Sequence, residues 1–588
     1  MGKTYISKRL QNQKSRLESS KTTNSIKSTV RTVVEDLTII GTRPITTTAK
    51  KLKLSRAQLV TESTIADDLA PNDDSFNNVN IIVGIETILS LVNKMSCPSC
   101  HCIGNMSQKV AQRRGLLYHI KFSCLSCSFE TAFTNSSQLV HSSTSRMDEL
   151  NMMACAAANV AGIKRTGMTT ILGMLNILPP VQIENWNRYQ KIYSSALDVV
   201  KDDSLRRAAD EAAEQSSEPV DHEGITNIKV SIDGTWLTRR GHSSLHGIAT
   251  VCSTADPTKV LDFECLSRYC STCSGLLGIK EHSPETYERL LAEHLKNGCQ
   301  QNHLGSSAGM EAAGIVKVFC RSEAKHLLRY TTFVADGDVN NERALIDAQP
   351  YGDTPIQRLQ CINHFSKRMR TALETLKKDY RDKKLEDGLP IGGRNGRLTD
   401  DKIHRLTVCY GSAIRSNVND LEAMKVACWN SFRQHDSTSG VAKKYSLVPA
   451  VMNALRPVYD KMCSTEVLSK VVEGGNTNPN ESYHSYIWSL CPKTRFHTAN
   501  YVRDSASLAA MLYNDGHQLS ITKLLRQCGI QSPIPACIRM LIMTDNERIK
   551  VQKPKTKTKK QKQRNQRLLV EQRLNQKEKY NYATGAFD

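Results

Sequence analysis

The alternation of hydrophobic and polar residues predicts a strand that ends at an acidic residue. Ile228, Val230 and Ile232 share one face and the residues between them are polar, which is the period of a half-buried strand. The alternation stops at Asp233, which is followed by glycine, and a second apolar run occupies residues 245–251. These features predict a hairpin with a rigidly held carboxylate at a sheet edge. A plain turn is the alternative, because Asp-Gly is a favoured hairpin pair.

Two further stretches place carboxylates in similar positions. Residues 259–270 alternate as the third strand of a meander. Residues 330–334 predict a short apolar strand that ends at Asp336, with Asp338 two residues on. Glu481 follows an Asn-Pro-Asn turn and falls in the first turn of a predicted helix, where its charge suits the helix dipole. Three acidic positions are thus expected at strand ends or at a helix start.

Helical periodicity dominates the rest of the ordered chain. Residues 147–215 predict helices interrupted at Pro179-Pro180, residues 375–470 are mainly helical, and a helix near 500–527 closes the chain's last ordered segment. The first of these regions is a candidate for DNA binding. Packing against a core is an alternative of equal weight.

The charge of the chain favours a polyanionic partner. The 588 residues carry a formal net charge of +21, and a surplus of this size is typical of proteins that bind nucleic acid. The basic tail from Lys550 predicts a nuclear-import signal or a nonspecific DNA contact, with a solubilising tail as the alternative. No window approaches the roughly 18 consecutive apolar residues of a membrane span, so we expect no membrane partner.

The 19 cysteines, in a chain without a recognisable secretory signal, favour zinc-bound thiolates in a reducing compartment over disulfides. Two C-x2-C knuckles flank an alternating segment, and together they predict a zinc ribbon with the ligands Cys97, Cys100, Cys124 and Cys127. Four thiolates leave no open position, so this zinc is expected to be structural. His101 and Cys102 are spare candidates.

A second group of possible zinc ligands follows the meander. Its spacing suits a CCHC site made of Cys270, Cys273, His294 and Cys299. Free thiols in a loop are the alternative.

Three converging carboxylates would repel one another unless cations lay between them. Hard oxygen ligands select Mg²⁺ or Mn²⁺, and two such ions about 4 Å apart serve phosphodiester chemistry. Together with the basic charge, Asp233, Asp336 and Glu481 therefore predict metal-dependent cleavage and transfer of DNA strands.

Several motifs together resemble the Mutator-like transposases of the DDE superfamily, in the animal branch that begins with a zinc knuckle pair. The likeness covers roughly residues 80–540. It is carried by SIDGTWLTRRGHSSLHG, SRYCSTC, the block that ends in LLRYTTFVADGD, CINHFSKRM and NPNESYHSYIWSLCPKT, besides the two knuckles CPSC and CLSCSFE. The C-x2-H pair of Cys361 and His364, between the second and third acids, is a mark of this type.

The resemblance implies a ribonuclease H-like α/β fold with a helical insertion, and it places Asp233, Asp336 and Glu481 on the DDE triad. The expected cofactors are two Mg²⁺ or Mn²⁺ ions and one or two structural Zn²⁺. Cleavage at transposon ends would free a 3′-hydroxyl that attacks target DNA. The expected partners are the terminal repeats, target DNA and a second copy of the chain, and the expected compartment is the nucleus.

The resemblance also implies supporting roles for residues around the triad. Cys361 and His364 would support the site. The second acid lies in ADGDVNN, which departs from the family's usual Gly-Asp-Ser, so Asp338 is an alternative ligand. A further Cys/His-containing segment usual after HDSTSG is missing. The candidates for DNA contact are Trp236, Arg239, Arg240, Lys367 and Arg368; packing or a solvated surface is their alternative.

These predictions divide the chain into seven segments. They are a basic disordered segment (1–75), a zinc ribbon (76–145), a helical region (146–224), the first part of the core (225–345), a helical insertion (346–470), the second part of the core (471–540) and a basic disordered tail (541–588). Two other functions remain open. One is a transposase-derived DNA-binding regulator without catalysis, and the other is a nuclease or structural zinc protein unrelated to transposition.

Overall fold

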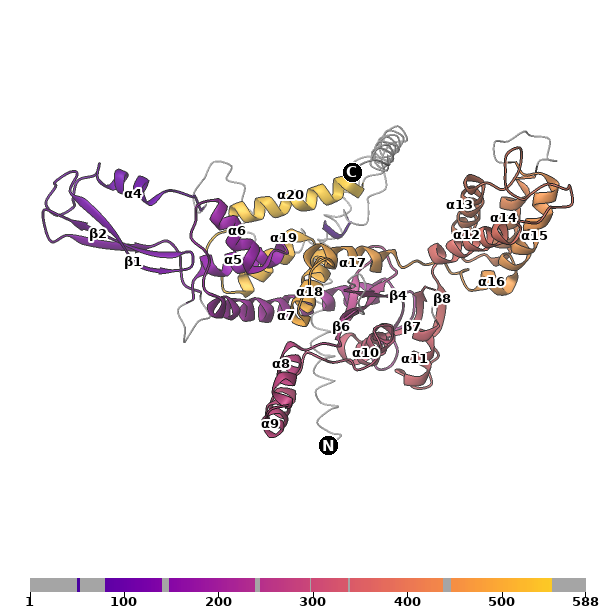
Figure 1. Ribbon diagram of the computed structural model, residues 1–588, viewed down its shortest axis with the longest axis horizontal. Helices are drawn as coiled ribbons and strands as arrows, with labels where there is room; N and C mark the ends of the chain where they lie inside the picture. Colours follow the sequence, from indigo (N-terminus) through magenta and orange to yellow (C-terminus); the bar gives the residue numbers. More distant parts are fainter. Residues whose placement is uncertain are drawn as a thin grey trace, which may run out of the picture.

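The computed structural model describes residues 50–52, 80–139, 147–237, 244–296, 298–336, 339–436 and 446–552. The molecule is elongated, with a small three-stranded sheet at one end, a five-stranded sheet in the middle and a helical unit at the other end (Figure 1). The expectations of disorder at 1–75 and in the tail beyond 552 concern residues outside the described part of the chain, apart from Lys50–Leu52. No helix in the described ranges is long and apolar enough to cross a membrane.

The central sheet begins with the expected antiparallel meander. Its strands are β4 (Thr226–Trp236), β5 (His246–Ser253) and β6 (Val260–Ser267), with β5 between the other two. Every residue of β5 is buried, because helices cover both faces of the sheet. The alternating pattern along β4 therefore places one set of side chains in each of two cores.

Two parallel strands extend the sheet on the other side of β4. They are β7 (Leu328–Ala335) and β8 (Gln357–Gln360), which give the order β6-β5-β4-β7-β8. β8 falls within 346–470, which was expected to be a helical insertion. Only Leu359 of β8 is buried, so this short strand carries no alternation by which it could be recognised. The helical insertion proper begins with α12 (Ile362–Asp379).

One helix covers the first face of the sheet. α10 (Gly309–His326) packs on β4, β5, β6 and β7. Its buried residues Ile315, Val318 and Phe319 join the apolar residues of β4 and β7 in one core. After β7, α11 (Asn340–Ala348) packs against α10 and leads to β8.

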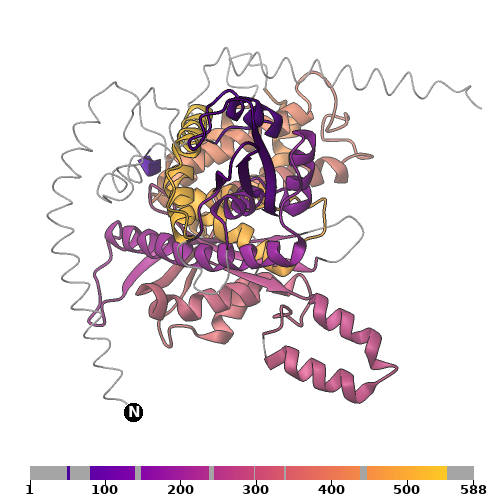
Figure 2. The same cartoon turned by 90° about the vertical axis from the view of Figure 1, so that its left-hand side faces the viewer.

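The second face is covered by helices from both ends of the chain. They are α7 (Ile183–Glu214), α17 (Asn478–Leu490) and α18 (Ala499–Asp515), and α19 (His517–Gln527) packs on α7 and α18. α7 contacts α18, α19 and the sheet, and it crosses the whole central body (Figure 2). The expected helical region is thus formed by α5 (Glu149–Val160), α6 (Lys164–Met174) and α7, and α5 and α7 are packed into the larger core.

A buried ion cluster fastens α10 to β6. Asp262 is 1% exposed, and it receives hydrogen bonds from Arg321 Nε (2.7 Å) and Lys325 Nζ (3.0 Å). Burial would raise the pKa of Asp262, but the hydrogen bond from Arg321 and the charge of Lys325 outweigh it and lower that pKa. The carboxylate form is therefore the one that stabilises the fold.

Asp262→Asn is expected to lower the free energy of unfolding by about 2–4 kcal/mol at pH 7, because it leaves two cations facing a neutral group. Since the folded-state pKa lies below the unfolded value, this stabilisation is present above pH 4 and is lost as the pH falls through the folded-state pKa. Denaturant unfolding at pH 7 and pH 3 measures the difference. Asp347→Asn, at an exposed position of α11, is the control, and equal losses in both variants would contradict the prediction.

The N-terminal unit is small. It contains α4 (Ile85–Val92) and the antiparallel strands β1 (Met106–Arg114), β2 (Leu117–Cys124) and β3 (Glu130–Thr134). Apart from cysteines, the buried residues of its apolar cluster, within the described part of the chain, are Met106, Ile120 and Phe122. A core of this size does not stabilise a fold unaided.

The helical insertion has a core of its own. It comprises α12, α13 (Asp400–Ser416), α14 (Leu421–Arg433), α15 (Pro449–Met462) and α16 (Thr465–Ser469). A separate hairpin of α8 (Ser271–Lys280) and α9 (Pro284–Lys296) projects from the central body (Figures 1 and 2). The last helix, α20 (Pro535–Gln552), continues past the boundary expected at residue 540.

Candidate active site and metal sites

Asp233 and Asp336 lie at the same edge of the central sheet. β4 and β7 are parallel, and Ser231 pairs with Val334, so the residues two positions further on reach the same level. The side chain of Asp233 is 25% exposed, and its Oδ1 accepts a hydrogen bond from the backbone of Gly234 (3.0 Å). Asp336 directly follows β7, and its backbone oxygen accepts a hydrogen bond from Arg358 of β8 (2.9 Å).

Glu481 is positioned by its neighbour Asn480. Asn480 is fully buried, and its amide donates to the backbone oxygens of Ser231 (3.2 Å) and Thr250 (3.1 Å) and accepts from the Ser231 hydroxyl (2.7 Å). These bonds fix the first turn of α17 on β4 and β5, next to Asp233. Glu481 follows at once and is exposed, and it is close enough to Asp233 for its negative charge to raise the pKa of that acid.

Asn480→Ala is expected to lower the free energy of unfolding by about 2 kcal/mol, because it leaves a buried hydroxyl and two strand carbonyls without this partner. Asn478→Ala is the matched control: Asn478 is exposed and bonds only the Asn363 side chain through its own. Denaturant unfolding of both variants gives the comparison. Similar stabilities for the two would contradict the anchoring role.

His484 contacts Asp233 from one turn further along α17. Its Nδ1 lies 3.5 Å from Asp233 Oδ2, and its Nε2 lies 3.0 Å from the Thr250 hydroxyl. Burial lowers the pKa of His484 to about 3, so the ring is neutral. The Thr250 hydroxyl donates its proton to the Asp233 backbone oxygen (2.9 Å), which leaves Nε2 as the donor and turns the Nδ1 lone pair towards Asp233.

The environment of Asp233 disfavours its charged form. Burial and the negative charges of Glu311, Asp336 and Glu481 together raise its pKa to about 8. A cation bound at this edge would reverse the balance, since an opposite charge favours the ionised carboxylate. The residues present therefore fit a divalent cation.

Glu311 is a fourth carboxylate that the sequence did not reveal. It lies in the first turn of α10, and its Oε1 accepts a hydrogen bond from the Asn341 amide (2.7 Å). A Cβ atom at position 234 would come within 2.6 Å of Glu311 Cδ. In the sequence, a single Glu at the start of a helix is explained by the helix dipole alone, so no signal pointed to this site.

The carboxylates stand further apart than zinc ligands do. Among the described residues, three or more ligand atoms lie within 4.8 Å of one another in only two groups, and both consist of Cys and His. These are the two groups expected from their spacing: Cys97, Cys100, Cys124 and Cys127, and Cys270, Cys273, His294 and Cys299.

The first Cys group has tetrahedral dimensions. The Sγ–Sγ distances are 3.7 Å for Cys97–Cys127 and 3.7 Å for Cys100–Cys124. A tetrahedron with Zn–S bonds of 2.3 Å has edges of about 3.8 Å, so these four sulfurs could hold zinc. Cys102 lies 3.2 Å from Cys100 and 3.5 Å from Cys124, but its sulfur is not among the four that all lie within 4.8 Å of one another.

The second group joins the base of the α8–α9 hairpin. Cys270 Sγ lies 3.2 Å from His294 Nε2, and Cys273 Sγ lies 3.4 Å from Cys299 Sγ. Neither α8 nor α9 has a buried residue. A bound zinc ion would thus supply the cohesion that an apolar core supplies elsewhere.

The Cys361–His364 pair lies between β8 and α12, next to the segments that carry Asp336 and Glu481. Cys361 is fully buried; its backbone N–H donates to Ala335 O (2.8 Å), and its Sγ accepts from the Thr477 hydroxyl (3.5 Å). It therefore connects the strand before Asp336 with the turn before Glu481. His364 is partly buried on the first turn of α12.

The expected DNA-contact residues have different surroundings. Trp236 donates its indole N–H to Ser307 O (2.8 Å) and so anchors the start of α10. Lys367 and Arg368 are exposed on α12, where Arg368 also bonds Gln360 (2.7 Å). Arg239, Arg240 and Asp338 lie outside the described residues.

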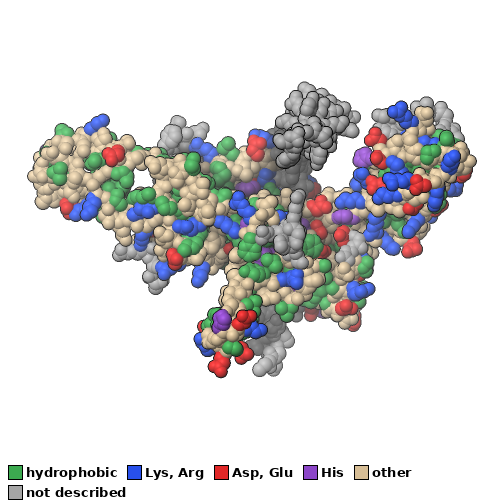
Figure 3. All heavy atoms as spheres, in the orientation of Figure 1, with side chains coloured by type: hydrophobic (Ala, Val, Ile, Leu, Met, Phe, Trp, Pro, Cys, Tyr) green, Lys and Arg blue, Asp and Glu red, His purple; other side chains and the backbone are tan. Residues whose placement is uncertain are grey.

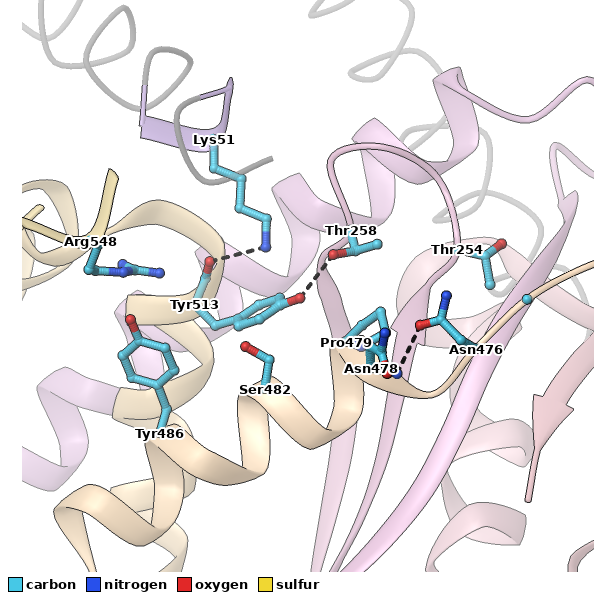
Figure 4. A pocket seen from close by; sticks show the side chains of 11 residues that line it. Lys51, Thr254, Thr258, Asn476, Asn478, Pro479, Ser482, Tyr486, Tyr513 and Arg548 are labelled. Atoms are coloured by element: carbon cyan, nitrogen blue, oxygen red, sulfur yellow. Dashed lines mark hydrogen bonds between the residues drawn. The ribbon is translucent and has the colours of Figure 1, made fainter. Parts of the chain in front are cut away.

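A cavity of about 350 Å³ opens beside the first turns of α17. Lys51, Tyr513 and Arg548 line it together with the turn at Asn476 and Asn478 (Figure 4). The Lys51 ammonium lies over the Tyr513 ring at 3.4 Å. None of the four carboxylates lines this cavity.

Comparison with known proteins identifies the family. Residues 79–439, more than half of the chain, match the family model described as Mutator-like transposase. The matched range includes Asp233, Glu311, Asp336 and both Cys/His groups. A search of the curated proteins finds no match. The match confirms the resemblance to Mutator-like transposases at the level of the family, and this chain belongs to that family.

Proposed function

We propose that this transposase cleaves DNA at the ends of its element and joins the freed 3′-hydroxyl to target DNA at a site formed by Asp233, Asp336 and Glu481. The observation that carries the proposal is their common position. Parallel β4 and β7 bring the first two acids to one level of one sheet edge, and Asn480 fixes the start of α17 beside them.

We further assign the central body to the ribonuclease H-like fold. An antiparallel meander followed by two parallel strands, with helices on both faces, supports this assignment. The insertion α12–α16 then lies between the second and third acids, where the family resemblance implies it.

The three carboxylates suit Mg²⁺ or Mn²⁺, which prefer oxygen ligands. Two such ions, when bound, supply activation of the attacking oxygen and stabilisation of the leaving oxygen. The chain itself holds the acids in place through strand pairing and Asn480. Cys361 would act indirectly, by keeping the elements that carry Asp336 and Glu481 in contact.

The two Cys/His groups are proposed as structural zinc sites, the first within a zinc ribbon. Lys and Arg side chains are spread along the visible face from the N-terminal unit to the helical insertion (Figure 3), which suits contacts with DNA backbones. Lys367 and Arg368 on α12 are the nearest candidates to Cys361. Nuclear localisation and assembly of two copies on paired ends complete the proposal.

The test uses the purified, zinc-loaded full chain and DNA that carries the element's own terminal repeats. We expect Mn²⁺-dependent cuts at the repeat ends that leave 3′-hydroxyl groups, followed by joining to a second DNA. Binding of the repeats without any cleavage would instead support a DNA-binding regulator. Cleavage without preference for the repeats would identify a nuclease unrelated to transposition.

A further inference from the structure

We propose that Glu311 is a fourth carboxylate of the active site and binds the cation that Asp233 binds. This inference rests on the proposed function, because it adds a ligand to the site of Asp233, Asp336 and Glu481. It assigns a role to a residue on α10, the helix that covers the face of the sheet opposite α17.

The start of α10 is held against β4 and β5, close to Asp233. The Trp236 indole bonds Ser307 just before the helix, and Met310 is 1% exposed. A Cβ atom at Gly247 would come within 2.8 Å of Met310 Sδ, so the helix start lies directly on β5. Glu311 follows Met310 and is thereby directed to the end of β4.

Gly234 makes room for the Glu311 carboxylate. Asp233 belongs to the face that contacts α17, and Gly234 belongs to the α10 face. The atom of Glu311 nearest to the position of a Cβ at residue 234 is Oε2. With no side chain in the way, a carboxylate from the α10 side lies against the β4 backbone next to Asp233, beyond the point where the pairing of β4 with β7 stops. Any larger residue at 234 would displace it.

Asn341 fixes the orientation of the same carboxylate. Asn341 is 3% exposed and donates to Oε1, which directs Oε2 towards the strand. It lies at the start of α11, five residues after Asp336. Glu311 is therefore linked to the segment that carries the second acid as well as to the strand that carries the first.

The charge of two bound cations can be compared with the charge of the carboxylates. Two divalent cations carry four positive charges, and Asp233, Asp336 and Glu481 supply three negative ones. Glu311 supplies the fourth. A carboxylate is costly to hold beside other carboxylates unless a cation is bound among them, so its fixed position is explained by a metal ligand better than by packing.

The test measures Mn²⁺ binding to the zinc-loaded full chain by isothermal titration calorimetry in the absence of DNA. Glu311→Gln keeps an oxygen that can accept from Asn341, and it is expected to weaken one Mn²⁺ site by about 10–100-fold. Gly234→Ala retains all four carboxylates but displaces Glu311, and it is expected to weaken the same site. Asp347→Asn removes one exposed charge from α11 and is expected to leave Mn²⁺ binding unchanged.

Asp233→Asn separates this inference from the proposed function. If Asp233→Asn weakens Mn²⁺ binding while Glu311→Gln and Gly234→Ala do not, Glu311 is only a packing residue and this inference fails. If Asp233→Asn also leaves binding unchanged, the proposed active site itself fails. Should Glu311→Gln not fold, Gly234→Ala decides the question.

Discussion

Asp233→Asn is expected to reduce DNA cleavage by about 10³-fold or more, because loss of a metal ligand removes several kcal/mol of transition-state stabilisation. Asn retains the size of the side chain and one oxygen, so the strand and its hydrogen bond from Gly234 are preserved. The measurement is the rate of cleavage of terminal-repeat DNA in Mn²⁺. Asp347→Asn, with the same change at an exposed position, should cleave at the parent rate.

The same variant is expected to be more stable than the parent when Mg²⁺ and Mn²⁺ are absent. Burial and the neighbouring acids raise the pKa of Asp233 to about 8 in the folded chain, whereas an unfolded Asp has a pKa of about 3.9. Between these values the folded state binds a proton that the unfolded state does not, so stability falls as the pH rises. Asn carries no charge and avoids this loss.

The expected stabilisation at pH 8.5 is on the order of 2–5 kcal/mol, and it should shrink towards zero near pH 4. Thermal unfolding from pH 4.5 to 8.5 measures it, in buffer without a chelator so that zinc stays bound. A variant that cleaves normally would refute the role of Asp233 as a ligand. A variant that is inactive but no more stable at high pH would refute the electrostatic account.

Together, these expectations describe a site that lowers the stability of the folded chain when no cation is bound. Asn480 and the strand pairing hold the acids in place, and the energy for this comes from the two large cores on either side of the sheet. The raised pKa of Asp233 is the local consequence of holding these acids together. This is the usual relation between a preorganised polar site and the scaffold that supports it.

The alternating pattern was sufficient to predict the strands next to Asp233. Ile228, Val230 and Ile232 are buried on the α10 side as predicted, and the run at 330–334 became the centre of β7. The spacing of the Cys and His residues likewise predicted both clusters. These signals are local, because each is set by a period or a spacing within one segment.

Features that depend on contacts between distant segments were not predictable in this way. β8 is a short edge strand with one buried residue, and its place beside β7 follows from tertiary packing. Glu311 enters the site only because α10 lies on β4 where Gly234 has no side chain. The sequence pattern predicted that Gly234 is a turn residue. In the structure it pairs with Ala249 inside the sheet, and its lack of a side chain leaves room for Glu311.

Cys97→Ser is expected to release one equivalent of zinc and to unfold the N-terminal unit, while the central body stays folded. Beside the cysteines, the buried residues of the unit's apolar cluster are Met106, Ile120 and Phe122. Structural zinc typically contributes more free energy than so small a core can. The central cores do not include any residue of this unit's strands, so the loss should not spread.

Zinc content by atomic absorption and hydrogen exchange measured by mass spectrometry test this expectation. Strands β1–β3 should lose their protection in Cys97→Ser, and peptides from β4 and β7 should keep theirs. Cys102→Ser is the matched control, because its sulfur lies beside that of Cys100 but is not among the four that all lie within 4.8 Å of one another. If Cys97→Ser kept its zinc, or if Cys102→Ser lost it, the ligand set would be wrong. If zinc were lost and the strands stayed protected, the ion would not be what stabilises this unit.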